Sequence, residues 1–312
     1  MPSSRSQVVN YLLKNVVKPF GRSGGRGPDV AWVRASVARA ARLAVPIPGV
    51  VVRPSRLADL PGEWVESLGG RATRTILYFH GGGYFFGSPT THRSLTRPLA
   101  KLSGCRVFAL RYRLAPEFPF PAAHEDALAA YLGLLEAGED PHEIVLAGDS
   151  AGGGLALSTL VALRDRGLPL PAAVVCFSPW TDLAATGRSL DTNDAHCAMF
   201  YGADIATSAR LYAGQASPEH PLISPLYADL GGLPPMLVHV SDSEVLLDDS
   251  TRLAERAKQA GVRVELAVWK SLPHVWQLFS PLMPEARRSL VQAADFIDRH
   301  TRRHWVPPYF TF

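Results

Sequence analysis

The chain reads Gly148-Asp149-Ser150-Ala151-Gly152-Gly153 immediately after the apolar stretch 143–147 (EIVLA). These residues fit the pattern G-x-S-x-G between a predicted strand and a predicted helix, an arrangement that projects a reactive serine from a sharp turn. Such a turn leaves no room for Cβ atoms two residues before and after the serine, which explains both flanking glycines. At a helix N-terminus, free N–H groups and the helix dipole favour developing negative charge. We therefore predict that Ser150 is a nucleophile.

A second stretch, Gly21-Arg22-Ser23-Gly24-Gly25, fits the same pattern. It follows no strand-like segment and lies in a charged, glycine-rich part of the chain. We interpret it as a loop without a catalytic role, because the pattern has a structural meaning only between a strand and a helix.

Outward from Ser150, short apolar segments alternate with helix-like segments. The predicted strands are 75–79, 106–110, 143–147, 172–177, 235–240 and 262–269. The predicted helices are 121–136, 150–166, 248–260 and 284–299. Short apolar strands separated by helices are typical of parallel strands buried on both faces. The expected fold class is α/β, with a mostly parallel, doubly wound sheet.

Two regions interrupt this alternation. Residues 1–45 have helical periodicity before any strand, and residues 183–221 form a mixed, polar insertion. Long insertions in a compact sheet are usually lids or binding elements. We expect 1–45 and 183–221 to form one helical cap, and 46–182 with 222–312 to form the catalytic core.

A run of glycines, His80-Gly81-Gly82-Gly83-Tyr84, follows the predicted strand 75–79. Glycines at the end of a strand leave backbone N–H groups free to point at a ligand, which suits an oxyanion hole with Ala151 N–H as a further donor. The alternatives are a phosphate-binding loop and a plain turn. No GK[ST] sequence follows, and the spacing fits a dinucleotide-binding fingerprint poorly.

A serine nucleophile needs a general base, which follows it in the chain in this type of fold. The histidines after Ser150 and outside 183–221 are His239, His274, His300 and His304. His239 lies within an apolar strand, and the last two lie on or after the final helix. His274 follows strand 262–269, at the strand end where Ser150 emerges, so it is the candidate base. Its alternative interpretation is a histidine of a surface loop.

The base needs an orienting carboxylate, and four acidic residues follow strand 235–240: Asp242, Glu244, Asp248 and Asp249. Asp248 and Asp249 open a predicted helix, where acidic side chains act as caps and dipole partners. Asp242 and Glu244 both lie on the loop, and spacing alone does not separate them.

Together these residues resemble the hormone-sensitive-lipase-like family of serine esterases (the bacterial family IV type) in the α/β-hydrolase fold. The resemblance extends from about His80 to His274. Beyond the two glycine motifs it rests on segments in the same order: Tyr112-Arg113-Leu114-Ala115-Pro116-Glu117, Phe120-Pro121-Ala122-Ala123, Ser224-Pro225-Leu226, Gly232-Leu233-Pro234-Pro235 and Pro273-His274.

The resemblance implies Ser150 as nucleophile and His274 as general base and acid, with the N–H groups of Gly82, Gly83 and Ala151 as oxyanion donors. The acid loop of the family commonly reads D-P-L-x-D-E, and Glu244-Val245-Leu246-Leu247-Asp248-Asp249 occupies those positions. Glu244 therefore takes the place of the catalytic acid, although the usual aspartate is replaced by glutamate and Asp242 is nearby.

The implied reaction is ester hydrolysis, with no metal and no organic cofactor. A triacylglycerol lipase is an alternative, but the sequence contains no broad apolar lid helix with interfacial character, so we expect short- to medium-chain acyl esters as substrates. A lactone hydrolase would use the same triad. A non-catalytic small-molecule receptor on this fold would lack a triad member, commonly the histidine. Tyr84, Phe85, Phe86, Met199, Phe200 and Trp276 are candidates to line the acyl pocket or to lie in the core.

The composition argues against several classes of partner and site. The 312 residues include 32 Lys and Arg against 28 Asp and Glu, a net charge of +4, which is too little to indicate nucleic acid. Three cysteines (Cys105, Cys176 and Cys197) without C-x-x-C spacing argue against a disulfide framework and a zinc site. No long apolar segment or signal peptide is present, so we expect no membrane contact and a cytoplasmic location. A homodimer is compatible with the sequence.

Overall fold

The computed structural model describes residues 2–21, 28–42, 46–68 and 73–301. Most of the second G-x-S-x-G match, residues 22–25, lies outside the described residues. No helix in the described ranges is long and apolar enough to cross a membrane.

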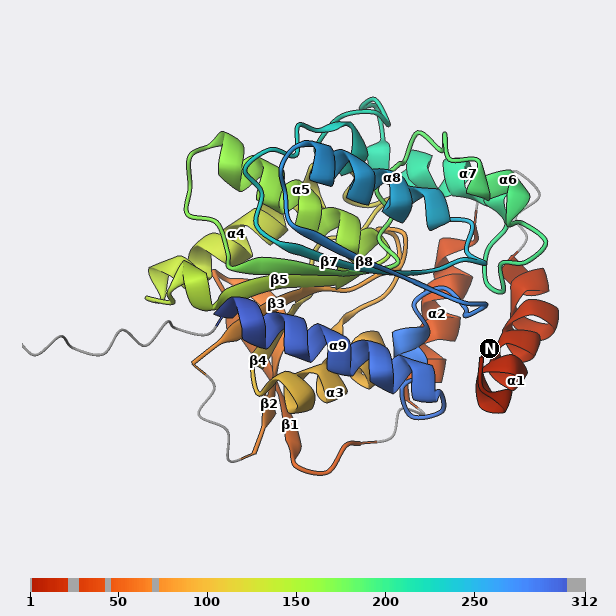
Figure 1. The fold of residues 1–312 in the computed structure, drawn as a ribbon, viewed down its shortest axis with the longest axis horizontal. Coiled ribbons are helices and arrows are strands. Elements are labelled where there is room, and N and C mark those ends of the chain that lie inside the picture. Colours follow the sequence, from red (N-terminus) through yellow and green to blue (C-terminus); the bar gives the residue numbers. More distant parts are fainter. Residues whose placement is uncertain (1, 22–27, 43–45, 69–72, 302–312) are drawn as a thin grey trace, which may run out of the picture.

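One eight-stranded sheet forms the centre of the molecule, in the order β1-β2-β4-β3-β5-β6-β7-β8 (Figure 1). β1 pairs antiparallel with β2, and β2 pairs antiparallel with β4, whereas the other six strands run parallel to one another. The strands are β1 Val50–Leu57, β2 Leu60–Ser67, β3 Thr75–Phe79, β4 Arg106–Leu110, β5 Ile144–Asp149, β6 Ala173–Phe177, β7 Met236–Ser241 and β8 Val264–Trp269.

Helices cover both faces of the sheet (Figure 1). One face carries α3 (Arg93–Ser103) and α9 (Pro284–Thr301), and the other carries α4 (Ala122–Glu136), α5 (Ala151–Asp165) and α8 (Leu247–Gln259). The remaining helices are α1 (Ser4–Leu12), α2 (Val30–Ala41), α6 (Ser189–Thr192) and α7 (Gly202–Ala213). Short helical turns occupy Leu13–Val17, Lys18–Gly21, Pro89–His92, Pro141–Glu143, Pro225–Tyr227 and Trp276–Phe279.

The central strands are largely apolar, and both of their faces are buried. All five residues of β3 are buried. Leu77 and Phe79 pack into the core layer that includes α4, α5 and α8, whereas Ile76 and Tyr78 pack into the layer with α3 and α9. The expected α/β class with a mostly parallel, doubly wound sheet is confirmed.

The sequence did not predict the antiparallel strands β1 and β2 at the edge of the sheet. These strands contain Pro54, Arg53 and Glu66, and most of their residues are partly exposed. They therefore show neither the continuous apolar run of a buried strand nor a clean alternation. A proline within a segment also argues against a strand except at the edge of a sheet, and β1 is an edge strand.

The topology brings five loops to one edge of the sheet. β3, β5, β6, β7 and β8 are parallel, so the segments that follow them emerge at the same side. These segments contain the glycines after His80, the turn at Ser150, and the loops of Ser178, Glu244 and His274.

Candidate active site

The turn between β5 and α5 presents Ser150 in a strained backbone conformation. Ser150 has φ +52° and ψ −123°, outside the ordinary regions for a residue with a side chain. A Cβ atom on Gly148 would lie 2.3 Å from the Gly152 carbonyl oxygen, and one on Gly152 would lie 2.0 Å from that of Phe79. Only glycine fits at these two positions, as the sequence pattern indicates.

His274 and Glu244 meet across the loops that follow β8 and β7. Nδ1 of His274 lies 2.5 Å from Oε2 of Glu244, and both side chains are buried. The other carboxylate oxygen, Oε1, accepts hydrogen bonds from the Ser241 N–H (2.7 Å) and the Ser178 hydroxyl (2.8 Å). Nε2 of His274 is buried and has no hydrogen-bond partner within the described part of the chain. A carboxylate can only accept, so Nδ1 carries the proton and Nε2 is left as an acceptor.

The three other acidic residues of this loop have different partners. Asp242 accepts a hydrogen bond from the Ser271 N–H at 2.7 Å. Asp248 accepts one from the Ser189 N–H at 3.1 Å. Asp249 accepts the N–H groups of Thr181 and Asp182, and burial raises the pKa of this carboxyl to about 8. Of the four, Glu244 is therefore the residue whose carboxylate contacts His274.

The glycine loop after β3 has a backbone that would be strained for a residue with a side chain. Gly82 and Gly83 have φ values of +117° and +58°, and a Cβ atom on Gly82 would lie 2.2 Å from the Phe86 carbonyl oxygen. Within the described residues, the N–H groups of Gly82, Gly83 and Ala151 donate no hydrogen bond. Free N–H groups on a constrained backbone are the donors that an oxyanion hole requires.

A buried polar network fixes the start of this loop to the nucleophile turn. The Gly81 N–H donates to Oδ1 of Asp149 at 3.0 Å, and Tyr78 donates its hydroxyl proton to the same oxygen. His92 lies 3.2 Å from Oδ2 of Asp149. A Cβ atom on Gly81 would lie 2.2 Å from that oxygen, so the close approach requires glycine. The Asp149 side chain, next to Ser150, therefore fixes the loop that carries the candidate oxyanion donors.

The charges of this network are set by burial and by pairing. Burial tends to raise the pKa of Asp149, but His92 and Tyr78 outweigh burial and hold this pKa below its usual value. Burial tends to lower the pKa of His92, and Asp149 offsets this, so the pKa of His92 is raised. Burial and the nearby His92 lower the pKa of His80 to about 3, so His80 is neutral at ordinary pH. Neither Tyr78 nor His92 lies in a motif, and the sequence held no signal for them.

The aromatic candidates divide between the site and the core. Phe200 packs edge-on against the His274 ring, with centroids 5.1 Å apart. Tyr84 is buried and stacks on Tyr212, with centroids 3.6 Å apart. Trp276 is fully buried and packs beside Trp269. Phe85 and Phe86 pack against each other. Of these five aromatic candidates, Phe200 is the one for which a ring contact with His274 is found among the described residues.

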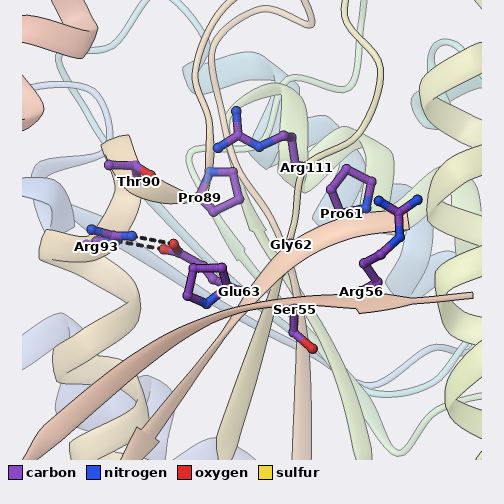
Figure 2. A pocket seen from close by; sticks show the side chains of 10 residues that line it. Ser55, Arg56, Pro61, Gly62, Glu63, Pro89, Thr90, Arg93 and Arg111 are labelled. Atoms are coloured by element: carbon purple, nitrogen blue, oxygen red, sulfur yellow. Dashed lines mark hydrogen bonds and ion pairs between the residues drawn. The ribbon is translucent and has the colours of Figure 1, made fainter. Parts of the chain in front are cut away.

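A surface pocket of about 460 Å³ lies beside the antiparallel strands β1 and β2 (Figure 2). Its wall includes the ion pair between Arg93 and Glu63, and it contains none of Ser150, Glu244 and His274. The described residues include no cluster of His, Cys, Asp and Glu that could hold a metal ion.

Comparison with known proteins agrees with the fold. A family model for the alpha/beta hydrolase fold matches residues 76–278. An "Acetyl-hydrolase" from Streptomyces hygroscopicus is 47% identical over 298 residues, covering 95% of this chain and 97% of the relative. An "Esterase" from Acinetobacter venetianus is 38% identical over 250 residues, covering 80% of this chain and 82% of the relative. The crystal structure of an esterase from the bacterial hormone-sensitive lipase family superimposes with a TM-score of 0.91 at 41% identity, covering 97% and 100% of the two chains.

The fold and the similarity define the class of protein as an α/β hydrolase. Within this class, the chain belongs to the hormone-sensitive-lipase-like family of serine carboxylesterases. The resemblance predicted from the sequence is therefore confirmed. The comparisons favour neither a lactone hydrolase nor a non-catalytic receptor.

Proposed function

We propose that this esterase hydrolyses short- to medium-chain acyl esters through an acyl-enzyme on Ser150, with His274 as general base and acid and Glu244 as the orienting carboxylate. The observation that carries the proposal is the contact between Nδ1 of His274 and Glu244, together with the unpaired Nε2 of the same ring. This arrangement fixes one tautomer and leaves its basic nitrogen free to accept the proton of a serine hydroxyl.

The chemistry has two steps. The Ser150 hydroxyl attacks the ester carbonyl while Nε2 of His274 takes its proton, and the N–H groups of Gly82, Gly83 and Ala151 stabilise the oxyanion. The tetrahedral intermediate collapses to the acyl-enzyme as His274 returns the proton to the leaving alcohol. Water, deprotonated by His274, then attacks the acyl-enzyme and releases the carboxylic acid and the Ser150 hydroxyl. Every group in these steps belongs to the chain, the ester or water, so the mechanism uses no metal and no organic cofactor.

The preference for short acyl groups rests on the relatives and on the packing near His274. One relative, 47% identical, is named as an acetyl-hydrolase. Phe200 packs against the His274 ring and therefore occupies space next to the reacting groups. A large aromatic ring at this position limits the room for a long acyl chain.

The cap proposal, 1–45 with 183–221 over a core of 46–182 and 222–312, is supported by contacts of the described residues. The Lys18 ammonium donates to the carbonyl oxygens of Asp194 (2.5 Å) and Cys197 (3.1 Å), which joins the two proposed cap segments. It also lies 4.3 Å from the centre of the Tyr201 ring. Arg34, in α2, donates to the Phe85 carbonyl oxygen at 2.7 Å, beside the glycine loop. Phe200, in the second proposed cap segment, also packs against the His274 ring. Contacts of both segments with the candidate site support a cap that selects the substrate.

We also propose a cytoplasmic location and a homodimer. The three cysteines are free and buried, as is usual in a reducing compartment. β8 is an edge strand of the sheet, and its Val268 side chain is 47% exposed. Edge strands with exposed apolar side chains are common surfaces of association. Sedimentation of the full chain over a range of concentrations tests the dimer, because a monomer at all concentrations would contradict it.

A panel of p-nitrophenyl esters and one γ-lactone tests the substrate class. We expect kcat/KM to be largest for acetyl to hexanoyl chains and to fall for dodecanoyl and longer chains. Replacing Phe200 with alanine should shift this preference toward longer chains, because the ring next to His274 is removed. A higher kcat/KM for the lactone than for every open ester would overturn the assignment to open esters.

A further inference from the structure

Ser178 lies directly after β6 and contacts both the candidate acid and the loop of the candidate base. Its side chain is fully buried. The hydroxyl donates to Oε1 of Glu244 at 2.8 Å and accepts the Val275 N–H at 3.3 Å. One hydroxyl therefore bridges the Glu244 carboxylate and the residue that follows His274.

The backbone at both ends of this bridge has a positive φ. Ser178 has φ +47° and Val275 has φ +48°. A positive φ is unfavourable for any residue with a side chain, and most of all for a β-branched residue such as valine. Strained conformations of this kind persist only where the surroundings determine them, and they cluster at functional sites. The contact between the Ser178 hydroxyl and the Val275 N–H is one such determinant, and it lies next to His274.

We propose that Ser178 is a positioning residue of the catalytic machinery, whose hydroxyl holds the Glu244 carboxylate and the His274 loop in register. The inference rests on the proposed roles of Glu244 and His274. The carboxylate has two oxygens, of which Oε2 faces His274. The donors to Oε1, the Ser178 hydroxyl and the Ser241 N–H, fix the rotation of the carboxylate, so that Oε2 remains directed at Nδ1.

The Ser178 hydroxyl is the side-chain donor in this arrangement, so substitution can remove it while the backbone remains. Ser178→Ala deletes the hydroxyl, and Ser178→Gly deletes it while also relieving the positive φ. A hydrogen bond to a charged group is worth more than one between neutral groups. We expect both variants to lower kcat about tenfold and to change KM less than about twofold, because the bond orients the catalytic groups rather than the substrate.

Ser243→Ala is the matched control. The Ser243 hydroxyl donates to the Leu272 carbonyl oxygen at 3.0 Å and lies 3.1 Å from the Ser241 hydroxyl. It therefore joins the same two loops, but its hydrogen bonds among the described residues do not involve the Glu244 carboxylate. We expect its kcat to remain within about twofold of the starting protein. Thermal unfolding of each variant reports separately on loss of the fold.

A double-mutant cycle with Glu244→Gln distinguishes positioning from a purely structural role. If Ser178 acts through the carboxylate, Ser178→Ala should cost less than about twofold in kcat when Glu244→Gln is already present. Two results would overturn the proposal. One is a full tenfold loss of kcat from Ser178→Ala both with and without Glu244→Gln, and the other is a kcat of Ser178→Ala and Ser178→Gly alone within about twofold of the starting protein. If Glu244→Gln alone left kcat unchanged, the assignment of Glu244 as the acid would fail instead, so the two failures are distinguishable.

Discussion

The Nδ1 atom of His274 and the Oε2 atom of Glu244 lie 2.5 Å apart, although 30 positions separate the two residues in the chain. The parallel pairing of β7 with β8 makes this contact, because it brings the loops that follow the two strands to the same edge of the sheet. The contact distinguishes Glu244 from Asp242, which instead accepts a hydrogen bond from the Ser271 backbone.

The first prediction compares the two acids. Glu244→Gln should lower kcat by about 10³-fold or more, because an amide cannot stabilise the imidazolium and can impose the wrong tautomer on His274. Asp242→Asn should change kcat less than about threefold, because it removes charge without touching His274. Steady-state hydrolysis of p-nitrophenyl acetate measures both values. A larger loss of kcat in the Asp242 variant would reassign the role of acid.

A second prediction concerns the turn at Ser150. Gly152→Ala should destabilise the protein by about 3 kcal/mol and inactivate it, because its Cβ atom would lie 2.0 Å from the Phe79 carbonyl oxygen and displace the strand or the helix. The control is Gly231→Ala, where the nearest atom is a side-chain oxygen of Asp229 at 3.3 Å. Urea unfolding measures the stability of both variants, and an esterase assay measures their activity. Normal activity of Gly152→Ala would show that the turn tolerates a Cβ atom after all.

A third prediction tests the cap. Lys18→Met removes both hydrogen bonds from the N-terminal segment to the Asp194 and Cys197 carbonyls. We expect KM to rise about fivefold, equivalent to about 1 kcal/mol of substrate binding, with kcat nearly unchanged, because the proposed cap would contact the substrate rather than the reacting bond. Lys14→Met, an exposed position of the same segment, serves as the control. Identical KM values for the two variants would count against a cap that includes both segments.

The pH dependence of stability gives a fourth prediction. Burial lowers the pKa of His239 from 6.5 to about 3. Below pH 6.5 the unfolded chain binds a proton there that the native protein does not bind, so native stability falls as the pH falls. One such group contributes a slope of about 1.4 kcal/mol per pH unit. His239→Gln should therefore flatten the dependence of the unfolding free energy on pH between about 6 and 4. Urea titrations at several pH values measure this slope, and an unchanged slope would contradict the assignment.

The strands that are buried on both faces could be predicted from the sequence alone. The bounds predicted for the strands 75–79 and 106–110 agree with those of β3 and β4, because both faces of these strands are buried and their residues are largely apolar. Strand β1 could not be predicted in this way. Its Arg53 and Pro54 are compatible with a strand only at the edge of a sheet, and the edge position is known only from the strand order.

Some site residues could likewise be predicted from the sequence, whereas others depend on contacts between distant parts of the chain. The turn at Ser150 and the glycines after His80 are local constraints, so their meaning can be inferred from adjacent residues. The choice between Asp242 and Glu244 depends on where a loop 30 residues later in the chain is placed, and spacing does not contain this information. Ser178 had no signal for the same reason, because its two partners come from other strands.

Labelling with a fluorophosphonate tests the central claim most directly. The probe reacts with a serine that is activated by a base and faces an oxyanion hole, and peptide mapping by mass spectrometry locates the modified residue. We predict a single label on Ser150, with both labelling and ester hydrolysis lost in a folded Ser150→Ala variant. A label on another residue, or full hydrolysis by that variant, would contradict the account.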